Sequence, residues 1–520
     1  MNDNAGAAQG EPDFDEQQAG DIPVDTPGAG TSVSRRRFLR AAVAGGVAIG
    51  VASLGYWGAE HGLPLNLLAP STPQPSGAPV MRRYRSRPDL SSPLISVTEP
   101  GLRAAAGLVC LTPAGGPGPM VVDNAGAAVW IHPVAGKRAL NLRVGTYASA
   151  PVLTWWEGQL VNGTGSGEYV LVDESYAEVA RIRAGNGLQG DLHEFITTPQ
   201  GTALFTVYAQ RPTLGASPGP SQVLDSIVQE VDMASGRVLF EWHSLDYVSP
   251  SESYAAPTAG QPFDYFHINS IDIEPDGNLL ISGRNTWGVY KIDRQSGALV
   301  WRLGGRRSDF AMGAGTQFSW QHDARRQPDG SITLFDDGSN GAHPPTEDHS
   351  RGIVLEIDEL AHTATLRREY SHAGILATSQ GSMQTQPNGN VLVGWGDQPY
   401  YTEFAADGSV VLDARLADGS TSYRALRFPW HGHPTDSPVV ATDPGDGAYT
   451  IVSASWNGAT EVAVWVVLGG DDADALVPLG SQPRSGFETA IEVAGQPQLV
   501  AVRALDGSGA ILGQSLPIRV

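Results

Sequence analysis

A turn motif that recurs along the chain is the feature that most restricts its fold. Each copy has a short apolar strand, an Asp, a tight turn that often ends in Gly, and a second strand that often carries Trp. The copies place their acidic residue at Asp123, Asp173, Asp232, Asp293 and Asp358, with a looser copy over 403–408. Asp and Gly at such a turn favour a hairpin of two antiparallel strands.

A second turn motif alternates with the first. Pro, one variable residue and Gly occur at 199–201, 275–277, 328–330 and 387–389, each before an apolar run. Every period of about 50–65 residues therefore holds two hairpins, and four strands per period are typical of a β-propeller blade. Six periods over about 95–428 predict an all-β fold with a six-bladed β-propeller over 82–434. An array of β-sandwiches with coincidental turns is the alternative.

The repeat stops after Pro434, and a different pattern follows. Alternating apolar residues over 449–456 and 461–468 flank Asn457-Gly458, which predicts two strands joined by an Asn-Gly hairpin turn. Further strands are expected over 487–493 and 498–504. Together they predict a small β-sandwich of immunoglobulin or fibronectin-III type over 435–520, with a role in packing or spacing.

The first 81 residues differ from the rest of the chain. Residues 1–33 are acidic and rich in Gly, Ala and Pro, so we expect a disordered tail. The motif SRRRFLR begins at residue 34 and precedes an uncharged stretch that ends at residue 59. Together, residues 34–59 are typical of a twin-arginine export signal. The alternative is a basic clamp beside an ordinary membrane anchor, since the stretch 41–59 is long enough to span a bilayer. A Pro-rich linker over 60–81 follows. We therefore expect the export machinery as a partner and a protein outside the cytoplasmic membrane, either released or tethered.

The composition argues against several function classes. A net charge of -22 is unfavourable for binding a nucleic-acid backbone. The chain has only two lysines, Lys137 and Lys291, and no phosphate-binding loop motif, so a nucleotide phosphate donor is not expected. The Gly-x-Gly-x-x-Gly pattern over 185–190 leads into a strand rather than a helix, and we interpret it as a loop. The single cysteine, Cys110, excludes an internal disulfide.

Three predicted inner strands each carry a histidine at the same position. The motifs are DLHE (191–194), HINS (267–270) and WQHD (320–323), each just before a Pro-x-Gly turn. Because inner strands line the channel of a propeller, we expect His193, His267 and His322 to face one axial region. The arginines near these motifs are Arg284, Arg306, Arg307 and Arg325.

Several chemistries fit such a group, and the residues alone leave them open. The histidines are structural, or they bind a metal through neutral imidazole, although no local ligand spacing supports this. The third option is nucleophilic attack by a neutral imidazole, with an arginine to hold an anion.

At these motifs the chain resembles the arylsulfotransferase family, in the branch typical of actinobacterial and fungal sequences. The matching motifs are YRSRPDL (84–90), PVLTWWEG (151–158), DLHEF (191–195), FHINS (266–270), GRN (283–285), WRLGG (301–305) and QHDA (321–324). The resemblance covers roughly 82–428 and implies a six-bladed propeller. It also implies transfer of a sulfuryl group from a phenolic sulfate ester to another phenol, without a nucleotide or other cofactor, through a sulfated histidine.

The resemblance further implies roles for single residues. His322 matches the nucleophile of the family. The groups that hold the sulfuryl oxygens and assist the leaving phenol match His193, His267, Asn269 and Arg284. The expected partners are an aryl sulfate donor and a phenolic acceptor, with no metal. Two alternatives stay open: an extracytoplasmic propeller that binds a ligand or partner without catalysis, and a metal-dependent hydrolase such as a sulfatase.

Overall fold

The computed structural model describes residues 80–213, 221–417, 419–445 and 448–520, whose regular structure is β-strand with short 3-10 helices. This confirms the prediction of an all-β fold. The predicted acidic tail, the export signal and nearly all of the linker lie outside the described residues. Within the described part of the chain, no helix is long and apolar enough to cross a membrane.

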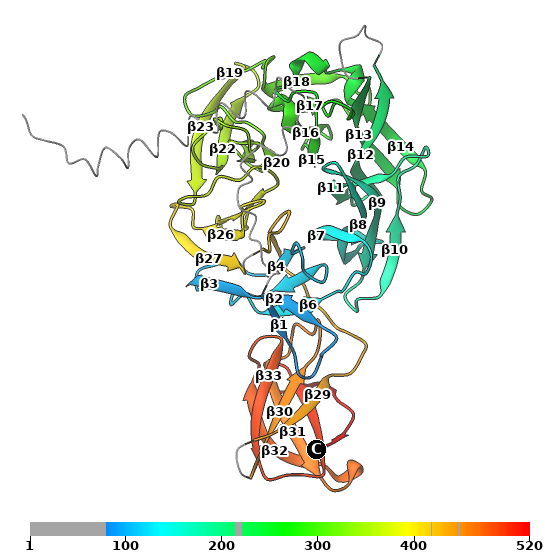
Figure 1. Ribbon diagram of the computed structural model, residues 1–520, viewed down its shortest axis with the longest axis vertical. Helices are drawn as coiled ribbons and strands as arrows, with labels where there is room; N and C mark the ends of the chain where they lie inside the picture. Colours follow the sequence, from blue (N-terminus) through cyan, green and yellow to red (C-terminus); the bar gives the residue numbers. More distant parts are fainter. Residues whose placement is uncertain (1–79, 214–220, 418, 446–447) are drawn as a thin grey trace, which may run out of the picture. The chain divides into compact units, whose positions relative to one another are not determined.

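Antiparallel sheets follow one another along the chain and surround a common centre (Figure 1). An eight-stranded sheet contains β7 (Arg138–Tyr147), β8 (Ala150–Val161), β9 (Thr164–Val172), β10 (Glu178–Ile182), β11 (Gly190–Thr197), β12 (Thr202–Pro212), β13 (Gln222–Asp232) and β14 (Val238–His243). The next sheet contains β15 (Ile268–Ile273), β16 (Leu279–Gly283), β17 (Gly288–Ile292) and β18 (Leu299–Gly304). Then come β20 (His322–Arg326), β21 (Ile332–Asp336), β22 (Arg351–Asp358) and β23 (Thr363–Ser371), with β19 (Ala311–Met312) parallel to β23.

Strands from the two ends of this region complete the last two sheets. The sheet of β24 (Ser382–Thr385), β25 (Val391–Gly394), β26 (Tyr400–Phe404) and β27 (Val410–Leu416) gains β3 (Ile95–Pro100) at its edge. The last sheet has the order β28 (Leu426–Phe428), β4 (Leu108–Leu111), β5 (Met120–Val122) and β6 (Ala128–Ile131), so a late strand shares a sheet with three early ones. A separate pair, β1 (Met81–Arg83) and β2 (Ser91–Pro93), precedes them. Early and late segments of the chain are therefore held together by strand pairing.

Both turn motifs occur where the sequence predicts hairpins. The Pro-x-Gly turns connect β11 to β12, β15 to β16, β20 to β21 and β24 to β25. The Asp turns connect the third and fourth strands of each group of four: β5 to β6, β9 to β10, β13 to β14, β17 to β18 and β22 to β23. At Asp123 the carboxylate accepts hydrogen bonds from the backbone N–H groups of Ala125 and Ala127, both at 2.9 Å. Gly126 then takes a φ of +73°, which glycine adopts without steric cost.

The core lies between neighbouring sheets, because successive side chains of a strand point to opposite faces. In β16, Ile281 packs in one apolar cluster with Trp242 of β14. Its neighbour Leu280 packs in the next cluster with Leu334 of β21. Strands that are apolar on both faces therefore join each sheet to the one before it and the one after it.

The last strands pair only with one another. One sheet contains β29 (Val439–Pro444), β30 (Tyr449–Ser455) and β33 (Glu488–Ala494). The other contains β31 (Val464–Gly470), β32 (Val477–Pro483), β34 (Leu499–Leu505), β35 (Ile511–Gln514) and β36 (Ile518–Arg519). The strands expected over 487–493 and 498–504 are confirmed as β33 and β34.

The predicted Asn-Gly hairpin is wrong, because β30 and β31 lie in different sheets. The Asn457 side chain accepts from the backbone N–H of Ile131 (2.9 Å) and donates to its carbonyl (3.0 Å). The N–H of Gly458 donates to the carbonyl of Val129 at 2.8 Å. This dipeptide therefore docks on β6 and carries the chain from one sheet to the other instead of reversing it.

Candidate functional site

The three histidines predicted to meet are carried by neighbouring strands. His193 lies in β11, His267 directly precedes β15, and His322 begins β20, while β15 contacts both β11 and β20. The rings of His193 and His267 are perpendicular, with centroids 4.7 Å apart. The charges of both rings act on the pKa of His322. The side chains of His193 and His322 are buried, at 4% and 2% exposure, and that of His267 is half-buried, at 12%.

Irregular strand pairing aims these rings. The register of each strand against its partner shifts at the histidine, between Gly190 and Phe195 in β11, at the start of β15, and between His322 and Arg325 in β20. Such bulges re-aim side chains and are frequent beside active sites. Several non-glycine residues here have a positive φ, namely His267 (57°), Trp287 (51°), Trp320 (58°), Asp323 (57°) and Gln380 (72°). Backbone strain of this kind gathers at functional sites.

Each of the three imidazoles has a carboxylate on its Nδ1. The pairs are His193 with Asp191 (2.5 Å), His267 with Asp264 (2.5 Å) and His322 with Asp337 (2.8 Å). The carboxylates fix the orientation of each ring and leave Nε2 as the nitrogen for chemistry. These aspartates were not among the site residues predicted from the sequence. No group of three or more His, Cys, Asp or Glu among the described residues is arranged to hold a metal ion.

The tautomer of His322 follows from its two hydrogen bonds. The backbone N–H of Gln380 donates to Nε2 at 3.2 Å, so this nitrogen carries the lone pair. The proton is then on Nδ1, which donates to Asp337. Burial lowers the pKa of His322 well below its usual value, and the charge of Arg284 lowers it further. His322 is therefore a neutral imidazole with its nucleophilic nitrogen held in a defined direction.

Arg284 lies at the end of β16, in a 3-10 turn over Arg284–Thr286. Its guanidinium donates to the carbonyl of Thr378 (2.8 Å) and to the side chain of Asn285 (3.0 Å). It lies over the indole of Trp320 at 5.1 Å. Among the described residues no carboxylate forms an ion pair with Arg284, and its buried Nε has no partner there. Burial lowers the pKa of Arg284, the charges of Asp337 and Asp264 oppose this shift, and the unpaired Nε remains as a donor for an anion.

Asn269 is fully buried in β15, at 0% exposure. Its amide nitrogen donates to the backbone carbonyl of Gln321 at 2.7 Å, just before β20. Its Oδ1 is buried and has no hydrogen-bond partner among the described residues. Asn269 thus connects two of the strands that carry histidines.

A cluster of buried charges lies beside the histidines, and we call it the Glu194 cluster. The carboxylate of Glu194 contacts Arg143 (2.6 Å), Arg424 (3.1 Å) and Arg325, while Asp323 contacts Arg325 (2.6 Å) and Arg424 (3.4 Å). Burial opposes ionisation of Glu194, but the three arginines hold its pKa well below the usual range. Asp272, whose pKa burial raises, also acts on Arg325, so the three arginines share this site with three carboxyl groups. Of these arginines only Arg325 was noted from the sequence, since Arg143 and Arg424 lie 51 and 230 residues from Glu194.

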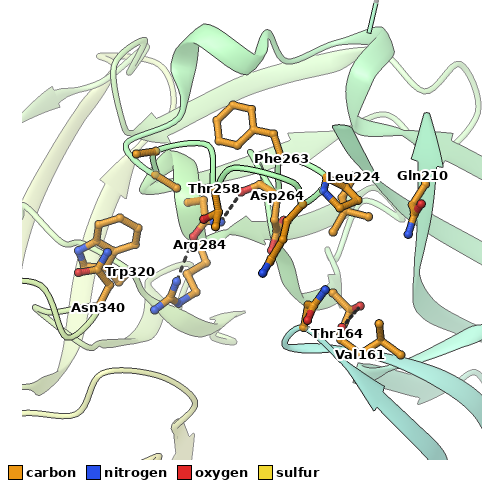
Figure 2. Close-up of a pocket in the computed structure, with 16 residues that line it drawn as sticks. Val161, Thr164, Gln210, Leu224, Thr258, Phe263, Asp264, Arg284, Trp320 and Asn340 are labelled. Atoms are coloured by element: carbon orange, nitrogen blue, oxygen red, sulfur yellow. Dashed lines mark hydrogen bonds between the residues drawn. The ribbon is translucent and has the colours of Figure 1, made fainter. Parts of the chain in front are cut away.

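A pocket of about 210 Å³ lies beside Asp264 and Arg284 (Figure 2). Asp264, the partner of His267, and Arg284 line it and connect it to the site. Its apolar lining includes Phe263 and Trp320, and at its rim lies Val161, from the tip of the β8–β9 hairpin. The predicted site residues are therefore brought together next to a cavity, with Arg284 as the only one of them that lines it directly.

Comparison with known proteins gives one family match. Residues 145–417 match the model of the family described as Arylsulfotransferase (ASST). A search of curated proteins finds no match.

Solved structures also resemble the chain, at low sequence identity. One is a protein of unknown function from Bacteroides caccae, 14% identical, with a TM-score of 0.38, covering 62% of this chain and 100% of its own. Another, from Dyadobacter fermentans, is 11% identical with a TM-score of 0.37 and covers 70% and 97%. A virginiamycin B lyase from Staphylococcus aureus is 9% identical with a TM-score of 0.33 and covers 69% and 96%.

Proposed function

Because the chain belongs to the arylsulfotransferase (ASST) family, we propose that it transfers a sulfuryl group from a phenolic sulfate ester to a phenolic acceptor. The observation that carries this proposal is the neutral imidazole of His322, whose Nε2 lone pair is fixed within reach of the Arg284 charge. A neutral nitrogen nucleophile and a guanidinium are the groups that attack on a sulfate ester requires.

In the first half-reaction Nε2 of His322 attacks the sulfur. The new N–S bond forms as the S–O bond to the phenolate breaks, and the electron pair of that bond goes to the phenolate oxygen. Arg284 holds sulfuryl oxygens through the step. The donor must first replace the N–H of Gln380 on Nε2, and this N–H is then in place to donate to a sulfuryl oxygen.

His193 is the proton carrier of this mechanism. Burial raises the pKa of its partner Asp191, but the charge and hydrogen bonds of His193 outweigh burial, so the pKa of this carboxyl is lowered and it holds the His193 ring through Nδ1. His193 gives a proton to the leaving phenolate and takes one back from the acceptor phenol, whose oxygen then attacks the sulfur. Burial lowers the pKa of His267, which favours the neutral form of this ring.

The test is turnover of 4-nitrophenyl sulfate with phenol as acceptor. We expect His322→Ala to abolish release of 4-nitrophenol, while His431→Ala, a histidine with 67% side-chain exposure, leaves it unchanged. Incubation with the donor alone should leave an acid-labile sulfuryl group on His322, which mass spectrometry detects. Undiminished turnover in His322→Ala would refute the mechanism. Donor hydrolysis that needs a metal and no acceptor would favour the hydrolase instead.

We also propose that the sheets around the common centre are the six blades of a propeller. The eight-stranded sheet then comprises two blades, β7–β10 and β11–β14, joined at the single pair Gly190 and Gly167. The blade of β28 and β4–β6 uses strands from both ends of this region. The two sheets of β29–β36 form the sandwich that follows.

Export through the twin-arginine pathway is part of the same proposal, and the motif SRRRFLR supports it. Replacing Arg35 and Arg36 with Lys is expected to keep the protein in the cytoplasm, as measured by cell fractionation. Export of the doubly substituted protein at the normal level would refute this route.

A further inference from the structure

The pocket beside Arg284 is apolar on opposite sides. Figure 2 shows Trp320 on one side and Val161 on the other, with Phe263 and Leu224 between them, and Arg284 reaching into the space they enclose. Val161, at the tip of the β8–β9 hairpin, is 52% exposed, so its side chain is accessible to a ligand in the pocket. The pocket therefore combines a cation with apolar side chains on two sides, set among polar residues such as Asp264 and Asn340.

The size of the pocket limits what it holds. Its volume is about 210 Å³. An apolar cavity of about 150 Å³ is sufficient to bind benzene. Pockets for larger, drug-sized ligands begin at about 300 Å³. One aromatic ring fits in this pocket and a second fused ring does not.

The Trp320 wall is held by a series of stacked side chains. The edge of Trp320 meets Trp287, with centroids 5.3 Å apart, and Trp287 stacks face to face on Tyr254 at 3.6 Å. The guanidinium of Arg306 covers the outer face of this stack, 4.1 Å from the Tyr254 ring. Arg284 lies over Trp320. Because each ring is packed against the next, the wall does not move back to admit a larger ligand.

We propose that this pocket is the seat of the aryl group and that it takes a single-ring phenol or the sulfate ester of one. Trp320 and Val161 are its two sides, and the oxygen of the ligand points to Arg284. The inference rests on the proposed function and adds to it the class of substrate, one-ring rather than fused-ring phenols.

The experiment measures binding of phenol and 2-naphthol to the full chain by ligand-observed NMR. Val161→Trp fills the pocket from its rim, so phenol affinity should fall by about tenfold or more. Val300→Trp is the matched control, because Val300 is also exposed, at 50%, and does not line the pocket. A buried second ring would add about tenfold in affinity, whereas a ring left in water adds little. We therefore expect 2-naphthol to bind no more than about fivefold tighter than phenol.

Two results would overturn the inference. One is phenol affinity in Val161→Trp equal to that of Val300→Trp. The other is 2-naphthol binding more than about fivefold tighter than phenol, since the second ring would then be buried. Turnover of 4-nitrophenyl sulfate in the same proteins separates this inference from the proposed function. If the binding pattern holds and no turnover is seen, the aryl seat stands and the proposed reaction fails.

Discussion

The buried position of Glu194 leads to a strong prediction about stability. Its carboxylate is the shared partner of Arg143, Arg325 and Arg424 and is 0% exposed. In Glu194→Gln, Asp323 is the one carboxylate among the described residues that still forms an ion pair with these guanidiniums, through Arg325 and Arg424. Removing one partner of a buried pair leaves an uncompensated charge and costs about 3–5 kcal/mol. We expect a loss in this range, because the Arg424 side chain, at 1% exposure, has no access to water.

Glu168→Gln is the matched control. Glu168 also contacts three cations, Lys137 at 3.4 Å, Arg181 at 2.9 Å and Arg183 at 2.7 Å. Their side chains are 42%, 29% and 70% exposed, so water replaces the lost partner. Exposed pairs contribute at most about 1 kcal/mol, and we expect the control to lose no more than that.

The assay is equilibrium unfolding in urea, followed by tryptophan fluorescence, for the wild type and both variants. A loss in Glu194→Gln no larger than that in Glu168→Gln would refute the reasoning. A second measurement isolates the charge effect. The double variant Glu194→Gln/Arg424→Met should lose less stability than the sum of its single variants, because it removes a cation together with its counter-ion.

Three further predictions concern the candidate site. The pKa of His322 in the folded protein lies below its value of about 6.5 in the unfolded chain. The contribution of this shift to the free energy of unfolding is therefore fully present above pH ~6.5 and is lost as the pH falls below that value. The acid limb of kcat/KM should accordingly lie below pH ~6.5 in a pH–rate profile. Asp337→Asn should lower kcat by roughly 10²–10⁴, since an amide N–H facing Nδ1 of His322 favours the wrong tautomer; unchanged kcat contradicts this. Gly381→Ala should lower the thermal midpoint, because φ is +105° and the added Cβ would lie 2.3 Å from Phe335; an unchanged midpoint would show that the turn adapts.

The hairpins were predictable because their signal is local. An Asp and a Gly within five residues determine a turn such as the one at Asp123, where the carboxylate itself binds the turn N–H groups. The same reasoning failed at Asn457-Gly458. The preference of this dipeptide for a tight turn is smaller than the gain from docking both groups on β6, and nothing near it in the sequence shows that contact.

The site was predictable only in part, for a related reason. The histidines were found because the repeat gives them the same position in three strands. Two of their carboxylate partners, Asp191 and Asp264, are close in sequence but lie at different spacings, two and three residues before their histidines, and the other charged groups lie farther away. Asp337 follows β21, and Arg424 comes from the segment before β28, 230 residues from Glu194. Only the arrangement of the sheets around one centre places these charges together, so sequence spacing carries no trace of them.

The same arrangement connects the fold to the proposed chemistry. Packing β11, β15 and β20 against one another excludes water from His322, and Arg424 of the Glu194 cluster adds a positive charge that acts on it. Both effects disfavour the imidazolium, and the charges of Arg284 and Arg424 act in the same direction as burial on the pKa of His322. A neutral imidazole next to a guanidinium places a nucleophile beside a group that binds an anion, as the proposed reaction requires. The buried charges that reduce the tolerance of this fold to substitution are therefore what keeps His322 unprotonated.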